Sequence, residues 1–304
     1  MEALANVTRQ LDGFFALAES ALDPAFSRFL PSTYEMEGRQ WRTWVEPQFA
    51  SRFNGLMLRG GETVTTVFLA AFPSDGVLRR FVAEAAPGDL LFVHHPIDLE
   101  SGDPRGAWGR FFRPIPIDLL QTLQAQSLSI YSCHAPLDYH ATLSTSRSIA
   151  DALEGRVVGE FFPYGPGHAG VIAEISPISL PTLSEALQRV FDIPYLDVAG
   201  AAPPVIRRIA IVAGAGDRTQ EMSNAETAGV QAYITGEIHS RIETEYGRAK
   251  FAEVERFAAT TGMALVGVSH AASEFLVMKR EMRDWFTARC AVKTELLPES
   301  HWWR

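Results

Sequence analysis

Short apolar runs alternate with amphipathic segments over most of the chain after residue 64. The runs at 64–69, 90–93 and 127–132 have the length and the β-branched or aromatic content of buried strands. Residues 77–85 and 117–126, which lie between these runs, have the apolar spacing of helices. Strands that alternate with helices predict an α/β fold. The alternation continues with a helix at 144–153, a strand at 171–175 and a helix at 183–191, and begins again at Val205.

The N-terminal residues also have helical spacing. Apolar residues recur at steps of three and four before Pro24, namely Leu4, Val7, Leu11, Phe14, Ala18 and Leu22. This spacing predicts a packing helix that proline ends. Residues 31–60 show no clear period, and we expect them to be irregular.

The two α/β stretches resemble each other. In each, a strand leads through a glycine-containing turn and a helix to a second strand, and then through another helix to a third. The motif His-Ala-x-x-acid ends both stretches, as His134 to Asp138 and as His270 to Glu274. A repeated order of elements indicates a duplicated unit. We expect an N-terminal helical and irregular segment at 1–50, α/β units at 51–160 and 205–290, a connecting strand and helix at 161–204, and a C-terminal tail at 291–304.

Composition narrows the class of protein. The 304 residues are 47% hydrophobic and 21% charged, which is typical of a globular protein. The net charge of −9 disfavours nucleic-acid binding, since phosphate backbones carry the same sign. No apolar run approaches the roughly 18 residues of a spanning helix, and the N-terminus lacks the features of a signal peptide, so we expect no membrane partner. The two cysteines form no Cys-x-x-Cys pair, which favours the cytoplasm.

Most of the histidines follow predicted strands, where ligands gather in α/β sheets. His94 and His95 follow one strand, His134 and His270 follow two others, and Glu237 and His239 follow a fourth. Imidazoles and carboxylates without thiolates suit a divalent Zn, Fe, Mn or Co ion. Glu274 lies one helical turn after His270, so both side chains can reach one ion. The pair His134 and Asp138 has the same spacing, although Pro136 favours a loop there.

Single motifs in this set are weak signals. A His-His pair alone is uninformative, but neighbouring histidines that point in different directions suit two adjacent ions. Gly214, Gly216 and Asp217 could turn backbone amides toward a phosphate. A tight turn in which Asp217 caps the next helix, with no metal ligand, is the favoured interpretation.

Five motifs together resemble the GTP cyclohydrolase 1 type 2 homologue family, also called the NGG-interacting-factor-like family. They are Asn54-Gly-Leu-Met-Leu, Phe92-Val-His-His-Pro96, His134-Ala-Pro-Leu-Asp138, Tyr233-Ile-Thr-Gly-Glu237 and His270-Ala-Ala-Ser-Glu274. The resemblance implies duplicated α/β units with mixed sheets, forming one compact two-lobed body around a dinuclear metal site, and a toroidal homohexamer. It implies two divalent ions per chain, held by His94, His95, Asp138, His270 and Glu274.

The resemblance places His134 and Glu237 at or just outside the ligand shell, as the candidate catalytic residues. Pro96 follows the histidines where many members have glycine, and the segment 31–49 looks longer than usual. We therefore expect a metal-dependent hydrolase that activates water and acts on a nucleotide, by ring opening of the GTP cyclohydrolase type or by phosphoester hydrolysis. The alternative is a non-catalytic metal-binding or regulatory protein that assembles as a ring.

Overall fold

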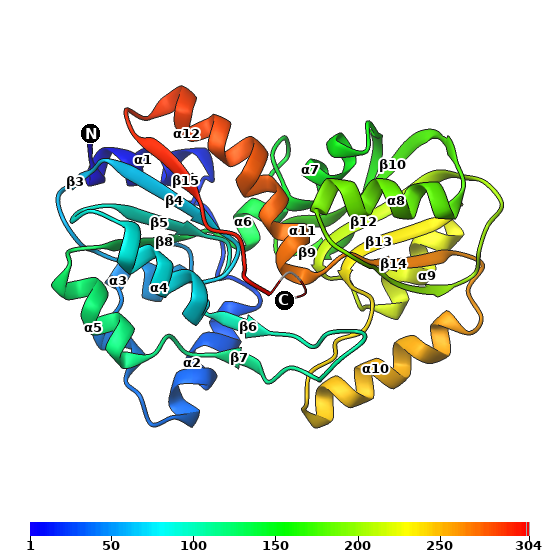
Figure 1. The fold of residues 1–304 in the computed structure, drawn as a ribbon, viewed down its shortest axis with the longest axis horizontal. Coiled ribbons are helices and arrows are strands. Elements are labelled where there is room, and N and C mark those ends of the chain that lie inside the picture. Colours follow the sequence, from blue (N-terminus) through cyan, green and yellow to red (C-terminus); the bar gives the residue numbers. More distant parts are fainter. Residues whose placement is uncertain (302, 304) are drawn as a thin grey trace. The chain divides into compact units, whose positions relative to one another are not determined.

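A computed structural model describes residues 1–301 and 303 and divides the chain into two compact units. Unit 1 contains Met1–Leu99, Phe112–His140 and Met278–Ser300. Unit 2 contains Glu100–Phe111, Ala141–Val277 and the described residues beyond Ser300. Figure 1 shows the helices and strands of both units. Among the described residues, no helix is both long and apolar enough to cross a bilayer.

Unit 1 is built on a mixed five-stranded sheet with the order β15-β4-β5-β8-β2. Four neighbouring strands are parallel: β15 (Lys293–Leu296), β4 (Thr66–Ala70), β5 (Leu90–Val93) and β8 (Ser129–Ser132). The edge strand β2 (Gly55–Leu58) is antiparallel to β8. Two further pairs are short: β1 (Glu2–Ala3) with β3 (Thr63–Val64), and β6 (Asp98–Glu100) with β7 (Phe111–Arg113).

Helices cover both faces of this sheet (Figure 1). Alternate strand residues such as Phe68 and Leu91 share one core with α2 (Phe26–Met36), η1 (Trp41–Thr43), α3 (Pro47–Arg52), α4 (Asp75–Glu84) and α5 (Ile117–Ala125). On the other face, Phe92 packs edge-on against Phe286 of α12 (Arg283–Arg289), near α1 (Leu4–Phe14). Because side chains of a strand alternate between faces, both faces of these apolar strands are buried.

Unit 2 has a mixed six-stranded sheet with the order β11-β14-β13-β12-β10-β9. Three neighbouring strands are parallel: β12 (Ile206–Ala215), β13 (Ala232–Glu237) and β14 (Ala264–Gly267). The other three pair antiparallel to their neighbours: β11 (Asp197–Gly200) with β14, β10 (Gly167–Ile178) with β12, and β9 (Arg156–Tyr164) with β10. One face packs under α7 (Thr145–Ala152), α8 (Leu180–Phe191) and α11 (His270–Val277), and the other under α9 (Thr219–Thr227) and α10 (Glu245–Ala258).

The predicted duplication is confirmed by the strand order. Unit 1 contains the neighbours β4-β5-β8 followed by the antiparallel β2, and unit 2 contains β12-β13-β14 followed by the antiparallel β11. In both units the antiparallel strand precedes the three parallel strands in the sequence. The prediction of an α/β fold with mixed sheets is therefore correct.

Several local predictions are wrong. Helix α1 ends at Phe14 instead of reaching Leu22, and Ala16 then adopts a positive φ of 49°. Residues 31–60 are not irregular, because α2, η1, α3 and β2 lie largely within them. The segment after His134 is a one-turn helix, α6 (Ala135–Asp138), since proline in the first turn of a helix loses no hydrogen bond. The helix that begins at His270 changes into a π-helical turn at Met278–Met282, where the chain passes from unit 2 to unit 1.

Candidate metal centre

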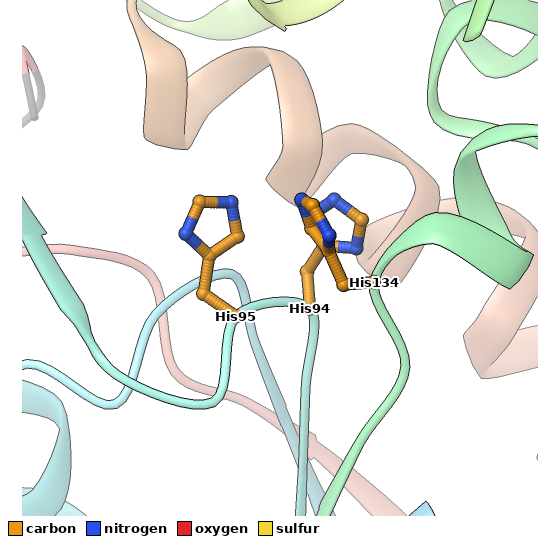
Figure 2. Close-up of side chains that lie close together, drawn as sticks. All are labelled: His94, His95 and His134. Atoms are coloured by element: carbon orange, nitrogen blue, oxygen red, sulfur yellow. The ribbon is translucent and has the colours of Figure 1, made fainter. Parts of the chain in front are cut away.

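Three histidines of unit 1 lie together at the carboxyl ends of two neighbouring parallel strands. His94 and His95 directly follow β5, and His134 follows β8. Since Val93 pairs with Ser132, these strand ends lie side by side. One ring nitrogen of each histidine lies within 4.8 Å of the others, and all three residues are buried. Figure 2 shows the three rings. We call them, with Asp138, the unit 1 cluster.

Asp138 completes this cluster from α6, one helical turn after His134. Its Oδ1 atom lies 3.2 Å from Nε2 of His94, and its Oδ2 atom lies 3.7 Å from Nε2 of His134. The carboxylate is largely buried. The unit 1 cluster therefore directs imidazole nitrogens and carboxylate oxygens to one place, as a divalent cation requires.

In two of these rings the other nitrogen, Nδ1, lies within hydrogen-bonding distance of a protein oxygen. Nδ1 of His94 lies 2.9 Å from the carbonyl oxygen of Cys133, and Nδ1 of His134 lies 2.9 Å from Oδ2 of Asp23. Both rings therefore turn Nε2 toward Asp138. Metal-binding histidines commonly donate their second N–H to a carbonyl or a carboxylate, which fixes the tautomer and the ring orientation.

Asp23 was missed by the sequence analysis, which left it in an N-terminal segment without a role. Its Oδ1 atom accepts hydrogen bonds from the backbone N–H groups of Ala25 and Phe26 at the start of α2. Burial raises the pKa of this carboxyl, but His134 and the backbone N–H groups outweigh burial and hold the pKa well below its usual range. An aspartate just before a helix is a capping signal that could have been recognised, but its contact with His134 could not.

Aromatic side chains surround His95. The ring centroid of Phe26 lies 5.1 Å from that of His95, and the centroid of Phe72 lies 4.5 Å from it. Both phenylalanines are fully buried. This apolar wall excludes water from one side of the cluster and so strengthens electrostatic interactions within it.

Unit 2 brings together a second set, which we call the unit 2 cluster: His270, Glu274 and Glu237. His270 begins α11 just after β14, and Glu274 lies one turn later on the same helix, as predicted. Nε2 of His270 lies 3.0 Å from Oε1 of Glu274, and Nδ1 lies 3.1 Å from Oε1 of Glu237. Burial lowers the pKa of His270, but the two carboxylates outweigh it and raise the pKa to about 10. The two carboxylates therefore favour a positive charge at this place.

Gly214 leaves room beside this cluster. Its φ is +71°, and a Cβ atom there would lie 2.5 Å from Oε1 of Glu274 and 3.0 Å from Nε2 of His270. Its backbone N–H donates to Oγ of Ser273. The predicted need for glycine at residue 214 is confirmed by this positive φ, although the residue lies near the end of β12 and not in a turn. A Cβ at residue 214 would fill the space next to the two ligand atoms, so the cradle fits a bound cation.

Asp217 does not cap the next helix, contrary to our expectation. Helix α9 follows Arg218 without a side-chain cap, and Asp217 accepts a hydrogen bond from Oγ of Ser240. Burial raises the pKa of the Asp217 carboxyl. His239 also lies outside the two clusters, with its ring nitrogens near Asp197 and Glu255.

Within each unit, the structure therefore gathers the predicted residues. Unit 1 contributes His94, His95, His134 and Asp138, and unit 2 contributes His270, Glu274 and Glu237. The potential metal ligands are imidazoles and carboxylates, which is the set expected for a divalent transition metal.

Comparison with known proteins identifies the family. The model of the DUF34/NIF3 family (NGG1p interacting factor 3) matches residues 48–297. This chain belongs to the DUF34/NIF3 family. The match begins before β2 and ends after β15, so it includes the unit 1 and unit 2 clusters but not Asp23.

Curated relatives and solved structures agree with this family. The chain is 29% identical over 195 residues to a "GTP cyclohydrolase 1 type 2 homolog" of Yersinia pestis, covering 61% of this chain and 69% of that protein. A protein of the same name from Pyrococcus abyssi is 26% identical over 234 residues, covering 76% of this chain and 83% of that protein. The solved structure of protein ybgI, titled as of unknown function, has a TM-score of 0.66 at 21% identity and covers 97% of both chains.

A second solved structure, TTHA1606 from Thermus thermophilus, has a TM-score of 0.61 at 17% identity and covers 98% of both chains. At such identities these structures support the fold alone.

Proposed function

We propose that this chain is a metal-dependent hydrolase that holds two divalent ions and acts on a nucleotide. The observation that carries the proposal is the unit 1 cluster, in which one ring nitrogen of each of three buried histidines lies within 4.8 Å of the others, beside the Asp138 carboxylate. Buried groups of this kind are expensive to desolvate, and a bound cation offsets that cost.

The proposal assigns ligands within each unit. His94, His95 and Asp138 would be the ligands of unit 1, and His270 and Glu274 those of unit 2. Two divalent ions, when bound, lower the pKa of a water molecule and polarise the bond to be cleaved. Imidazole and carboxylate ligands accept Zn, Fe, Mn or Co.

The remaining two residues have distinct tasks in the proposal. His134 holds its Nδ1 proton on Asp23, so its Nε2 atom is the one that takes a proton from an attacking water. Glu237 contacts Nδ1 of His270 and orients that ring. Glu237 therefore acts through His270 and not directly on a substrate.

The substrate class rests on the names of the relatives. Those from Yersinia pestis and Pyrococcus abyssi are named as homologues of GTP cyclohydrolase 1 type 2. Ring opening of a purine nucleotide and hydrolysis of a phosphoester both require an activated water and a polarised acceptor, and the two clusters contain suitable residues for both.

The test is a metal-restored activity screen. Protein stripped of metal is reloaded separately with Zn²⁺, Fe²⁺, Mn²⁺ and Co²⁺, and each form is assayed on GTP, other nucleotides and model phosphoesters. We expect turnover with at least one metal, and loss of that turnover in His134→Gln even when excess metal keeps its sites filled. Full metal occupancy without turnover on any compound would instead favour a non-catalytic metal-binding or regulatory protein.

A further inference from the structure

We infer that Asp23 is a positioning residue for His134, whose ring it fixes through Nδ1 so that only Nε2 faces Asp138. The inference rests on the proposed function, because ring orientation matters only where the unit 1 cluster binds an ion or a water. It assigns a part of the site to the segment that precedes the family match, which begins at residue 48.

The two oxygens of Asp23 have different partners. Oδ1 accepts from the N–H groups of Ala25 and Phe26 and caps the start of α2. Oδ2 points the other way, with Nδ1 of His134 at 2.9 Å, the N–H of Ala135 at 3.1 Å and Nδ2 of Asn54 at 3.3 Å. A helix cap needs only one oxygen. The second oxygen is therefore committed to His134 and its surroundings.

The backbone of His134 is held from the same side. Oδ1 of Asn54 accepts the N–H of His134 at 2.7 Å, and Nδ2 of the same amide donates to Asp23. The ring of Phe26, in the helix that Asp23 caps, lies edge-on to the His134 ring with centroids 4.5 Å apart. The Asp23 carboxylate, the Asn54 amide and the Phe26 ring together allow the His134 imidazole only one orientation.

The duplicated fold explains why this carboxylate comes from the N-terminal segment. In unit 2, the carboxylate beside Nδ1 of His270 is Glu237, two residues after Thr235 of β13. In unit 1, the residue two positions after Val93 of β5 is His95, which has no carboxylate to offer. Val93 and Thr235 occupy corresponding places, because each pairs with the next parallel strand at its carboxyl end. Asp23 supplies the carboxylate that this strand end lacks.

The experiment has two readouts. In metal-free protein labelled with ¹⁵N-histidine, we expect a slowly exchanging Nδ1–H signal from His134, assigned by its loss in His134→Gln. In Zn²⁺ titrations, Asp23→Ala should bind about 10- to 100-fold more weakly than wild type and should lose the Nδ1–H signal. Asp23→Asn, whose amide oxygen can still accept this hydrogen, should retain the signal and most of the affinity.

Asp89 provides a matched control. It is also buried and accepts three backbone N–H groups, from Thr65, Thr66 and Ala86, with no imidazole among these partners. Asp89→Ala should lower stability as Asp23→Ala does, but leave the Zn²⁺ affinity and the His134 signal unchanged.

Three results separate the possible failures. If wild type binds no Zn²⁺, the proposed function fails, and the Nδ1–H signal still tests the inference. If wild type binds Zn²⁺ and Asp23→Ala binds it equally tightly with the signal intact, the inference is overturned while the proposed function stands. If Asp23→Ala does not fold, the wild-type spectrum and Asp23→Asn decide, and absence of a protected Nδ1–H in wild type overturns the inference.

Discussion

In three of the four imidazoles of the two clusters, the two ring nitrogens face different kinds of partner. In His94, His134 and His270, Nδ1 faces a carbonyl or carboxylate oxygen of the protein and Nε2 faces the acid of the cluster. The protein therefore fixes each ring before any ligand arrives. Such preorganisation lowers the conformational cost of binding an ion.

At the residue scale, we predict that Glu274 matters more than any single histidine, if it bridges the two proposed ions. A bridging carboxylate also screens the repulsion between two dications. Glu274→Ala should lower the metal content from about two ions per chain toward none, whereas His95→Ala should leave about one. Elemental analysis measures both, with Glu295→Ala on the exposed side of β15 as the control. Full occupancy in Glu274→Ala would exclude the bridging role and make Asp138 the next candidate.

Gly214 gives a second residue-scale prediction. Alanine there meets both a positive φ and the ligand atoms of Glu274 and His270, so Gly214→Ala should lower stability and reduce metal content. Gly38 is the matched control, because its φ is +67° and no atom lies within 4 Å of its would-be Cβ. Gly38→Ala should cost only the backbone strain, about 1 kcal/mol, and bind metal normally. Equal metal content in the two variants would show that the space beside Gly214 is not used by the ion.

At the element scale, the sequence predicted the buried parallel strands β4, β5 and β8 well, but it did not predict the edge strands β9, β11 and β15. The apolar run at 90–93 is β5 without a change of boundary, and the histidines after it lie where the pattern placed them. These predictions succeeded because buried parallel strands are continuous apolar runs. The prediction for the N-terminal segment was wrong, because proline and a short 3-10 turn interrupt its helical pattern. Pro31 lies inside α2, and η1 separates α2 from α3. The role of Asp23 depends on a contact with a residue 111 positions away, which no local pattern contains.

Helix α7 provides an element-scale test of stability. Oγ of Ser146 donates to the carbonyl of Ala169 in β10 and accepts the N–H of Ala213 in β12, and the residue is fully buried. Ser146→Ala would leave both backbone groups unpaired, so we expect a loss of about 2 kcal/mol in the free energy of unfolding. Urea denaturation measures it. Ser51→Ala, which removes an exposed hydroxyl bonded to Gln48, should change stability by less than about 0.5 kcal/mol, and an equal loss in both variants would contradict this account.

At the scale of the whole molecule, the duplication places a histidine and an acid at the same point of each unit, but the second contacts differ. In unit 2, His270 is oriented by Glu237, a carboxylate of its own sheet. In unit 1, His134 is oriented by Asp23, a carboxylate of the N-terminal segment. The sequence motif His-Ala-x-x-acid showed the first similarity. It could not show the difference, since Asp23 lies outside every motif.

The resemblance to the family also leads us to expect a homohexamer. Closed symmetry is the usual outcome when identical chains assemble. Light scattering at micromolar concentration should give about six times the 33.5 kDa mass of one chain. A monomer under the same conditions would contradict this prediction without affecting the ligand assignments.

Anomalous scattering from metal-reconstituted crystals would show directly whether the two clusters hold two divalent ions per chain. We expect two anomalous peaks per chain, about 3.5 to 4 Å apart as in other paired sites, with His94, His95 and Asp138 and with His270 and Glu274 as ligands. A single isolated peak, or none after reconstitution at full metal supply, would contradict it.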